Sequence, residues 1–311
     1  MIRFLVAAML AFLPISVAAQ PAGEEQPFTS HVAEFDRFAV ETATTERAER
    51  VALFRARFAD VFPGFYALRG RDEARHEARI AQALEAYPRL RERILAVDAA
   101  FAESFATGLP RMQAVFPDFG VTMPVHLVQS MGEMDGGTRT IDGTTYLIFG
   151  ADMIAQLHDA DTVGPLLDHE LFHMYHKRFF SCEPLWCSAW REGLATYVAE
   201  RMNPGATDRQ LLLHLPVSLR EAVDPRFDEA MCLLAAKRNS EEDADYAPFF
   251  YFSTDGATGF PGRFGYYLGY RIARQVGEGM SLEALAKLTP EQVRPRFDRA
   301  ITELADCSGT E

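Results

Sequence analysis

The sequence has no excess of positive charge, which limits the partners it can bind. Lysine and arginine together number 31, against 44 aspartates and glutamates, so the formal net charge is −13 at pH 7. Nucleic acid and anionic membranes both present dense negative charge and favour basic proteins. We therefore expect neither nucleic acid nor an anionic membrane as a partner.

Long apolar runs are also missing after the first nineteen residues. That opening segment has one basic residue, Arg3, then an apolar run that contains Pro14 and ends in small residues. A membrane span needs about 20 apolar residues, and this run is shorter. A basic residue followed by an apolar run and then small residues is typical of a secretory signal peptide, here over 1–19 and cleaved after Ala19. Loss of Arg3 leaves 30 basic against 44 acidic residues, or −14. We expect a periplasmic or secreted protein with no membrane contact after signal removal.

Cysteine is scarce, with four residues in a chain of 311. An even number in an exported protein indicates disulfides. Cys182 and Cys187 can close a short loop, which leaves Cys232 to pair with Cys307. Three pairings are possible, and this one is the simplest. A zinc site made of these thiols is disfavoured, because no second close cysteine pair follows the first.

The chain has no internal repeat, and its first part has a helical pattern. Residues 20–30 are polar and contain proline, so we expect a disordered lead-in there. Over 31–116, phenylalanines recur at three- and four-residue steps, which predicts a helical N-terminal region. We expect Pro63-Gly64 and Pro88 to break this stretch into several helices.

The part from 117 to 311 starts with strand patterns and continues with helices. Residues 121–130 predict a strand, and 138–150 predict a hairpin that turns at Asp142-Gly143. Helices are predicted over 151–158, about 162–180, 188–203 and 264–276. A few strands followed by many helices predict an α+β fold.

The segment Leu167–His173 contains the pattern H-E-x-x-H. On a helix, His169 and His173 lie four residues apart on one face, so both imidazoles can reach one metal ion. Glu170 is rotated by about 100° around the axis. It can therefore reach a metal-bound water without being a ligand. The alternative is an amphipathic helix with incidental histidines.

A third ligand determines the type of site. In H-E-x-x-H-x-x-G-x-x-H the last histidine completes the set, but here His176 stands in the glycine slot and Phe179 in the final one. His176 is itself a poor ligand, because a straight helix places it about 10 Å along the axis from His169. Glu192 is the better candidate, since the eighteen intervening residues can end one helix and return on a second.

With Glu192-Gly193-Leu194-Ala195, the chain resembles the gluzincin metallopeptidases, in which H-E-x-x-H is followed by E-G-x-A on the next helix. The spacing and the nearby Trp190 are similar to the aminopeptidase branch. Residues 265–270 are more similar to exported bacterial zinc-dependent proteases of the same clan. The resemblance covers about 145–275. It implies a zincin-like catalytic domain over 117–311, but not specificity for amine termini.

The resemblance also implies the chemistry. Zinc held by His169, His173 and Glu192 keeps one position open. A zinc-activated water, with its pKa lowered to about 7, attacks a peptide bond. Glu170 is the general base, and later passes the proton to the leaving amine. The expected substrate is a peptide or protein.

Several residues outside the predicted ligand set are candidates for supporting roles at the metal site. Tyr266 is the first candidate for stabilising the oxyanion and Tyr270 the second; the alternative is that both rings pack a buried helix. Asp168 and Glu200 could orient the imidazoles, or could be ordinary surface charge. In this clan, the strand corresponding to 144–149 pairs with extended peptide; here it could equally be fully paired within its sheet.

Two other functions use the same residues. One is a non-catalytic, zinc-stabilised binding protein. Glu170 argues against it, as does the count of three ligands, because a structural zinc site normally has four protein ligands. The other is a hydrolase of a non-peptide amide or ester.

Overall fold

A computed structural model describes residues 28–252 and 258–308. The expected signal peptide over 1–19 lies outside these residues, as does most of the expected lead-in over 20–30. The last three residues of the lead-in form a strand, β1 (Phe28–Ser30), so the prediction of disorder is wrong for these three residues. The cause is tertiary, because β1 pairs with a strand almost a hundred residues later in the chain.

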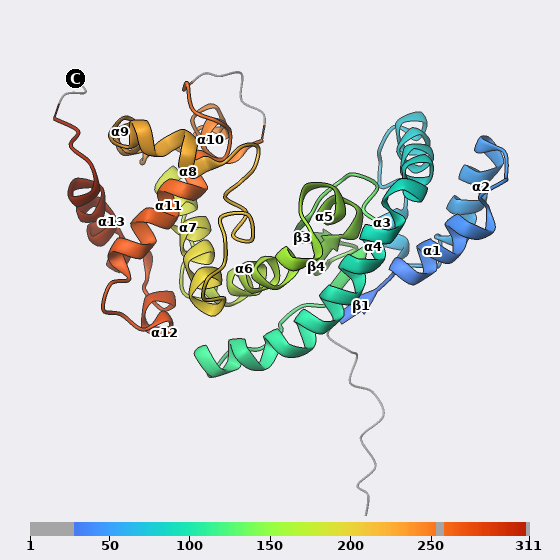
Figure 1. Cartoon of the computed structure of the whole chain (residues 1–311), viewed down its shortest axis with the longest axis horizontal. Helices are drawn as coiled ribbons and strands as arrows, with labels where there is room; N and C mark the ends of the chain where they lie inside the picture. Colours follow the sequence, from blue (N-terminus) through green and yellow to red (C-terminus); the bar gives the residue numbers. More distant parts are fainter. Residues whose placement is uncertain (1–27, 253–257, 309–311) are drawn as a thin grey trace, which may run out of the picture.

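The N-terminal region is helical, as the phenylalanine pattern predicts. It contains α1 (Val32–Glu41), α2 (Arg47–Arg57), the short α3 (Pro63–Tyr66) and the long α4 (Glu73–Val115). Buried aromatic rings from α1, α2 and the residue after α2 pack together beside α4, with the ring of Phe54 stacked on that of Phe58 at 4.2 Å. In Figure 1 these two helices lie at one end of the molecule.

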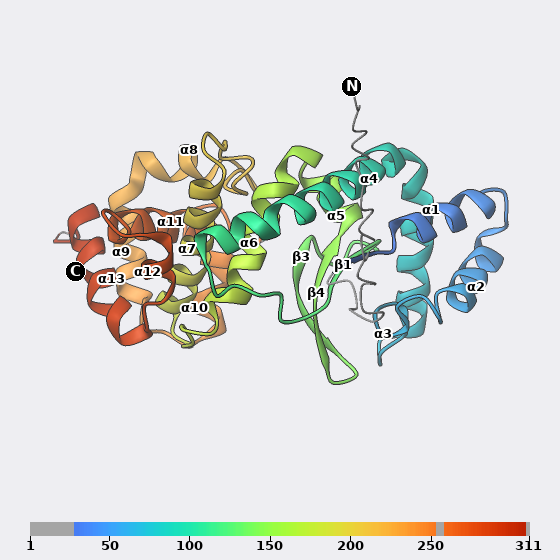
Figure 2. The same cartoon turned by 90° about the horizontal axis from the view of Figure 1, so that it is seen from below.

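Pro88 does not end a helix, contrary to the prediction. Helix α4 continues through both Pro88 and Pro110. A proline inside a helix leaves the carbonyl four residues earlier without its donor. Here Arg50 Nη1 donates to that carbonyl, on Leu84, at 3.4 Å. The ribbon of α4 changes direction in its first half (Figure 2), as proline kinks do.

A four-stranded mixed sheet has the order β1-β2-β4-β3. Strands β2 (Val125–Val128) and β4 (Thr144–Gly150) are parallel neighbours, and β3 (Gly136–Ile141) pairs antiparallel with β4. The predicted hairpin is confirmed, since Asp142 and Gly143 have φ of 49° and 82°, as a type I′ turn requires. Strand β4 is paired on both sides, so of the two alternatives for 144–149 the fully paired strand is the one observed. The edge strand next to it is β3.

The rest of the chain is mainly helical, and its helices from residue 185 onward gather at the end opposite to α1 and α2 (Figures 1 and 2). The α+β prediction is confirmed. The helices after the sheet are α5 (Ala151–Leu157), α6 (Val163–His176), α7 (Leu185–Met202), α8 (Leu219–Val223), α9 (Phe227–Lys237), α10 (Asp243–Phe250), α11 (Phe264–Val276), α12 (Leu282–Ala286) and α13 (Pro290–Leu304).

Both expected disulfides are present, Cys182–Cys187 and Cys232–Cys307. Two bridges are consistent with an oxidising compartment outside the cytoplasm. Within the described ranges, no helix has the length and apolar character needed to cross a membrane.

Candidate metal centre

Helices α6 and α7 bring three predicted ligands to one point. His169 and His173 lie one turn apart on α6, and Glu192 lies on α7. The Nε2 atoms of the two histidines are 3.0 Å apart. Glu192 Oε2 lies 3.2 Å from His173 Nε2 and 3.4 Å from His169 Nε2. These residues form a group that could hold a metal ion.

The triangle of ligand atoms has the right size for zinc. Zinc binds nitrogen and oxygen at about 2.0–2.2 Å in a tetrahedral site, so two ligand atoms stand about 3.3 Å apart. The three observed separations, 3.0, 3.2 and 3.4 Å, fit this value. The donor set, two imidazoles and a carboxylate, also suits zinc.

The ionisation of Glu192 and that of His173 depend on each other. Burial opposes charge on Glu192, yet the His173 and His169 imidazoles hold the pKa of its carboxyl well below the usual range. Burial also opposes protonation of His173, but the carboxylate of Glu192 nonetheless raises the pKa of this imidazole. Each partner thus stabilises the charge of the other, so Glu192 stays ionised, as a metal ligand requires, and a metal ion would displace the proton from His173.

The position of α7 depends on close contact with α11. A Cβ atom on Gly193 would lie 1.9 Å from the carbonyl carbon of Gly269, and one on Gly269 would lie 2.0 Å from the Ala189 oxygen. The two backbones touch, which only glycine permits. The glycine of the E-G-x-A pattern therefore has a packing role, and it places α11 beside the triad.

Glu170 is next to the triad but is not part of it. It lies on α6, and burial raises the pKa of its carboxyl although the neighbouring imidazoles of His173 and His169 lower it. The edge strand comes close here, because a Cβ on Gly136 would lie 3.5 Å from Glu170 Oε1. The first residue of β3 thus faces the carboxylate that the sequence identifies as a base.

The two candidate tyrosines have different surroundings. Tyr270 is buried, and its hydroxyl donates to Glu200 at 2.7 Å and accepts from Arg274 at 3.2 Å. Burial raises the pKa of the Tyr266 hydroxyl, and the charge of Glu192 raises it further. Of the two tyrosines, Tyr266 is therefore the one affected by the charge of the triad. The hydroxyl of Tyr270 is instead engaged by Glu200 and Arg274.

Asp168 and Glu200 do not bond an imidazole in the described structure. Asp168 Oδ2 accepts from Arg111 at 3.0 Å and from Asn203 at 2.8 Å. Glu200 accepts from Tyr270. Successive helix residues point about 100° apart, so Asp168 faces α4 and the end of α7 while His169 faces the triad.

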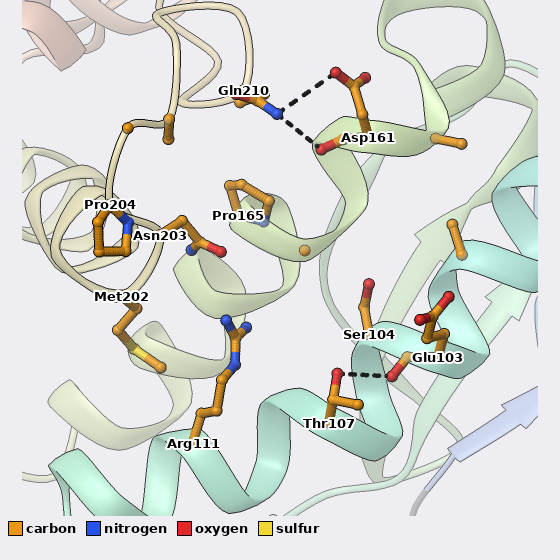
Figure 3. Close-up of a pocket in the computed structure, with 15 residues that line it drawn as sticks. Glu103, Ser104, Thr107, Arg111, Asp161, Pro165, Met202, Asn203, Pro204 and Gln210 are labelled. Atoms are coloured by element: carbon orange, nitrogen blue, oxygen red, sulfur yellow. Dashed lines mark hydrogen bonds between the residues drawn. The ribbon is translucent and has the colours of Figure 1, made fainter.

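Two hollows lie on different sides of α6. The larger, about 720 Å³, lies between α4, the start of α6 and the segment after α7, and no triad residue lines it. Figure 3 shows Arg111 and Asn203 in its wall, with Gln210 bonded to Asp161. A smaller pocket of about 170 Å³ includes Glu170 and His173 in its wall. The small pocket is the one beside the triad.

One neighbour of the triad carries no signal in the sequence. Tyr246 lies on α10, and burial and then the charge of Glu192 raise the pKa of its hydroxyl. Its ring stacks on Phe250, which in turn contacts the ring of Tyr266. No local pattern connects α10 with the motif helices, so only the fold reveals this residue.

The chain was compared with models of protein families, with curated proteins and with solved structures, and none of them matches it.

Proposed function

We propose that this protein is an exported zinc-dependent metallopeptidase. His169, His173 and Glu192 hold the metal, and Glu170 is the general base. The observation that carries this is the convergence of three ligand atoms at zinc spacing with the half-buried carboxylate of Glu170 beside them. Three protein ligands leave a fourth position for water or substrate, as in catalytic zinc sites.

The residues around the metal divide the chemistry among them. A bound zinc supplies a Lewis acid and lowers the pKa of a water to about 7. Glu170 accepts a proton from the attacking water and passes it to the leaving nitrogen. Burial, which raises the pKa of Glu170, favours the protonated state needed for the second transfer. The hydroxyl of Tyr266 keeps its proton because its pKa is raised, and it donates to the developing oxyanion.

The edge strand supports a peptide as the substrate. In the described sheet, β3 pairs with β4 on one side only. An extended peptide can add to such an edge through main-chain hydrogen bonds. Because Gly136 begins β3 beside Glu170, a peptide on this edge would carry its backbone past the base. The small pocket, with Met123, Leu147 and Met174 in its wall, would accept an apolar side chain.

The Glu170→Gln substitution tests this function. It keeps the size of the side chain and removes the base, so we expect normal folding and zinc content with hydrolysis reduced by about 10²–10⁴. Peptide hydrolysis is measured together with zinc per chain by elemental analysis.

The matched control is Glu183→Gln, an exposed carboxylate in the loop between α6 and α7, which should hydrolyse at the normal rate. The variants His169→Ala and Glu192→Ala should lose zinc. A fully zinc-loaded Glu170→Gln protein with unchanged activity would remove Glu170 from the mechanism.

A further inference from the structure

Four arginines converge on the carboxylate of Glu133, in the loop before β3. Arg71, Arg79 and Arg69 lie 2.6, 3.5 and 3.6 Å from Glu133 Oε2. Arg139 lies 3.8 Å from Glu133 Oε1. These five residues are called the arginine cluster below.

The arginine cluster has more positive charge than its surroundings neutralise. Over the described residues, Glu133 is the only carboxylate within 4.0 Å of any of these four arginines. The formal charge of the cluster is therefore +3, in a protein whose net charge is −13. The contrast with Arg55 is clear, because that single arginine has two carboxylates, Glu73 and Glu77.

The cluster is also partly withdrawn from water, so solvent does not screen it fully. The side chains of Arg69, Arg71 and Arg79 are 24%, 25% and 25% exposed and that of Glu133 is 14% exposed, whereas Arg139 is 43% exposed. Arg71 Nη1 is buried and has no hydrogen-bond partner. Burial and then the charge of Arg71 lower the pKa of Arg69. An unpaired buried donor and uncompensated charge both cost free energy.

From this geometry we propose that the arginine cluster binds a small dianionic oxyanion such as phosphate or sulfate. Guanidinium groups offer paired N–H donors that match the oxygens of such anions. A dianion would offset most of the +3 charge and could satisfy Arg71 Nη1. Anion binding at this cluster is independent of the proposed peptidase activity.

The bound anion would join separate parts of the fold. Arg69 and Arg71 precede α4, Arg79 lies on α4, and Arg139 lies on β3. Glu133 is three residues before Gly136, which faces Glu170. Since three residues span at most about 10 Å, the anion would sit one short loop away from the metal centre. It would tie the helical N-terminal region to the edge strand.

Calorimetric titration and thermal unfolding with inorganic phosphate test the site, with sodium chloride at matched ionic strength as the reference. We expect one phosphate per chain and a rise in Tm of about 2–4 °C at a tenfold excess over Kd. Arg71→Gln should weaken phosphate binding at least tenfold. Arg55→Gln, which removes a nearby arginine already paired with two carboxylates, should bind phosphate as the unmodified protein does.

A second variant changes the charge in the opposite direction. Glu133→Gln raises the formal charge of the cluster to +4, so it should lower Tm in sodium chloride and bind phosphate more tightly than the unmodified protein. This result does not depend on the stability of Arg71→Gln. Equal Tm values in phosphate and chloride, with no heat of binding, would overturn the proposal, as would weaker binding in a folded Glu133→Gln protein.

Discussion

His176 shows how the surroundings of one residue decide its role. It follows the second histidine of the triad by three residues, yet it lies between the rings of Phe172 and Phe180, each at 5.1 Å. Its Nδ1 donates to the Ala286 oxygen at 2.9 Å, and the residue is 1% exposed. The prediction that His176 is not a ligand agrees with this position. Burial lowers the pKa of its imidazole to about 4.

This shift predicts a loss of stability in mild acid. Folded His176 stays neutral, whereas in the unfolded chain its pKa is near 6.5, so the unfolded state binds a proton that the folded state does not. The stability due to neutral His176 is therefore full above pH 6.5 and is lost as the pH falls from 6.5 towards 4. At about 1.4 kcal/mol per pKa unit, the loss by pH 4.5 is about 2–3 kcal/mol.

The measurement is urea unfolding of the metal-free protein and of metal-free His176→Asn at pH 7 and pH 4.5. Asparagine can keep the donor to Ala286 and does not titrate, so the variant should lose less stability on acidification. Other histidines, such as His126, whose pKa burial also lowers to about 4, contribute equally to both proteins. Identical losses in the two proteins would show that His176 does not contribute.

At the scale of elements, the contact between α7 and α11 decides the shape of the site. Gly193 and Gly269 let the two helices meet backbone to backbone, and this places Tyr266 on the side of the triad. A methyl group added at Gly193 or Gly269 would meet backbone atoms, which cannot move aside as the end of a flexible side chain can. The crossing is therefore a point where a small change in sequence shifts a whole helix.

Gly193→Ala should accordingly destabilise the protein. Alanine is favoured over glycine in a helix by about 1 kcal/mol, but overpacking against a rigid backbone costs about 1–3 kcal/mol or more. We expect a net fall in Tm, measured by thermal unfolding. The matched control is Gly164→Ala on α6, where the added Cβ would meet Ser104 Oγ at an ordinary 3.7 Å. That variant should be neutral or more stable. A Gly193→Ala protein as stable as this control would contradict the close crossing.

The elements that the sequence predicts well are those whose signals are local. Asp142-Gly143 marks the hairpin turn, and α11 has the predicted bounds. Both predictions rest on patterns within a few neighbouring residues. Strand β1 is missed because its three residues depend on a distant partner. The continuity of α4 through Pro88 is missed because it involves Arg50, from another helix.

At the scale of the whole molecule, the triad joins two helices that the chain separates by a disulfide-closed loop. His169 and His173 come from α6 and Glu192 from α7, so a metal bound there would hold these two consecutive helices together. Since the unfolded chain has no preformed site, metal binding would add to folding stability. The same site would then serve both chemistry and structure.

Removal of zinc should therefore lower the thermal stability. A metal present at 1,000 times its Kd stabilises the folded state by about 4 kcal/mol, which corresponds to a Tm change of roughly 10 °C for a chain of this size. Thermal unfolding is compared before EDTA treatment, after it, and after zinc is restored. The Tm of Glu192→Ala should not respond to zinc. If the Tm of the unmodified protein changed neither on EDTA treatment nor on addition of zinc, the metal site would be contradicted.

The sequence predicts the centre of the site but not its surroundings. His169, His173 and Glu192 follow from a helical spacing and one following pattern, and the structure brings them together. Tyr246 and the arginine cluster come from segments that only the fold places together; Arg71 and Glu133, for example, are 62 positions apart in the sequence. No periodicity or motif connects such residues, because their proximity depends on packing between distant elements, α10 against α11 for Tyr246 and α4 against the sheet for the arginine cluster.

The second disulfide has a topological consequence. Cys232 and Cys307 are 75 residues apart, and α11 with Tyr266 lies between them. The chain between these cysteines is a closed covalent ring, so a single backbone cut anywhere inside it releases no fragment. Both new ends stay tethered, and buried helices in the ring can remain packed. In a compartment that contains proteases, this segment can be nicked without being lost from the molecule.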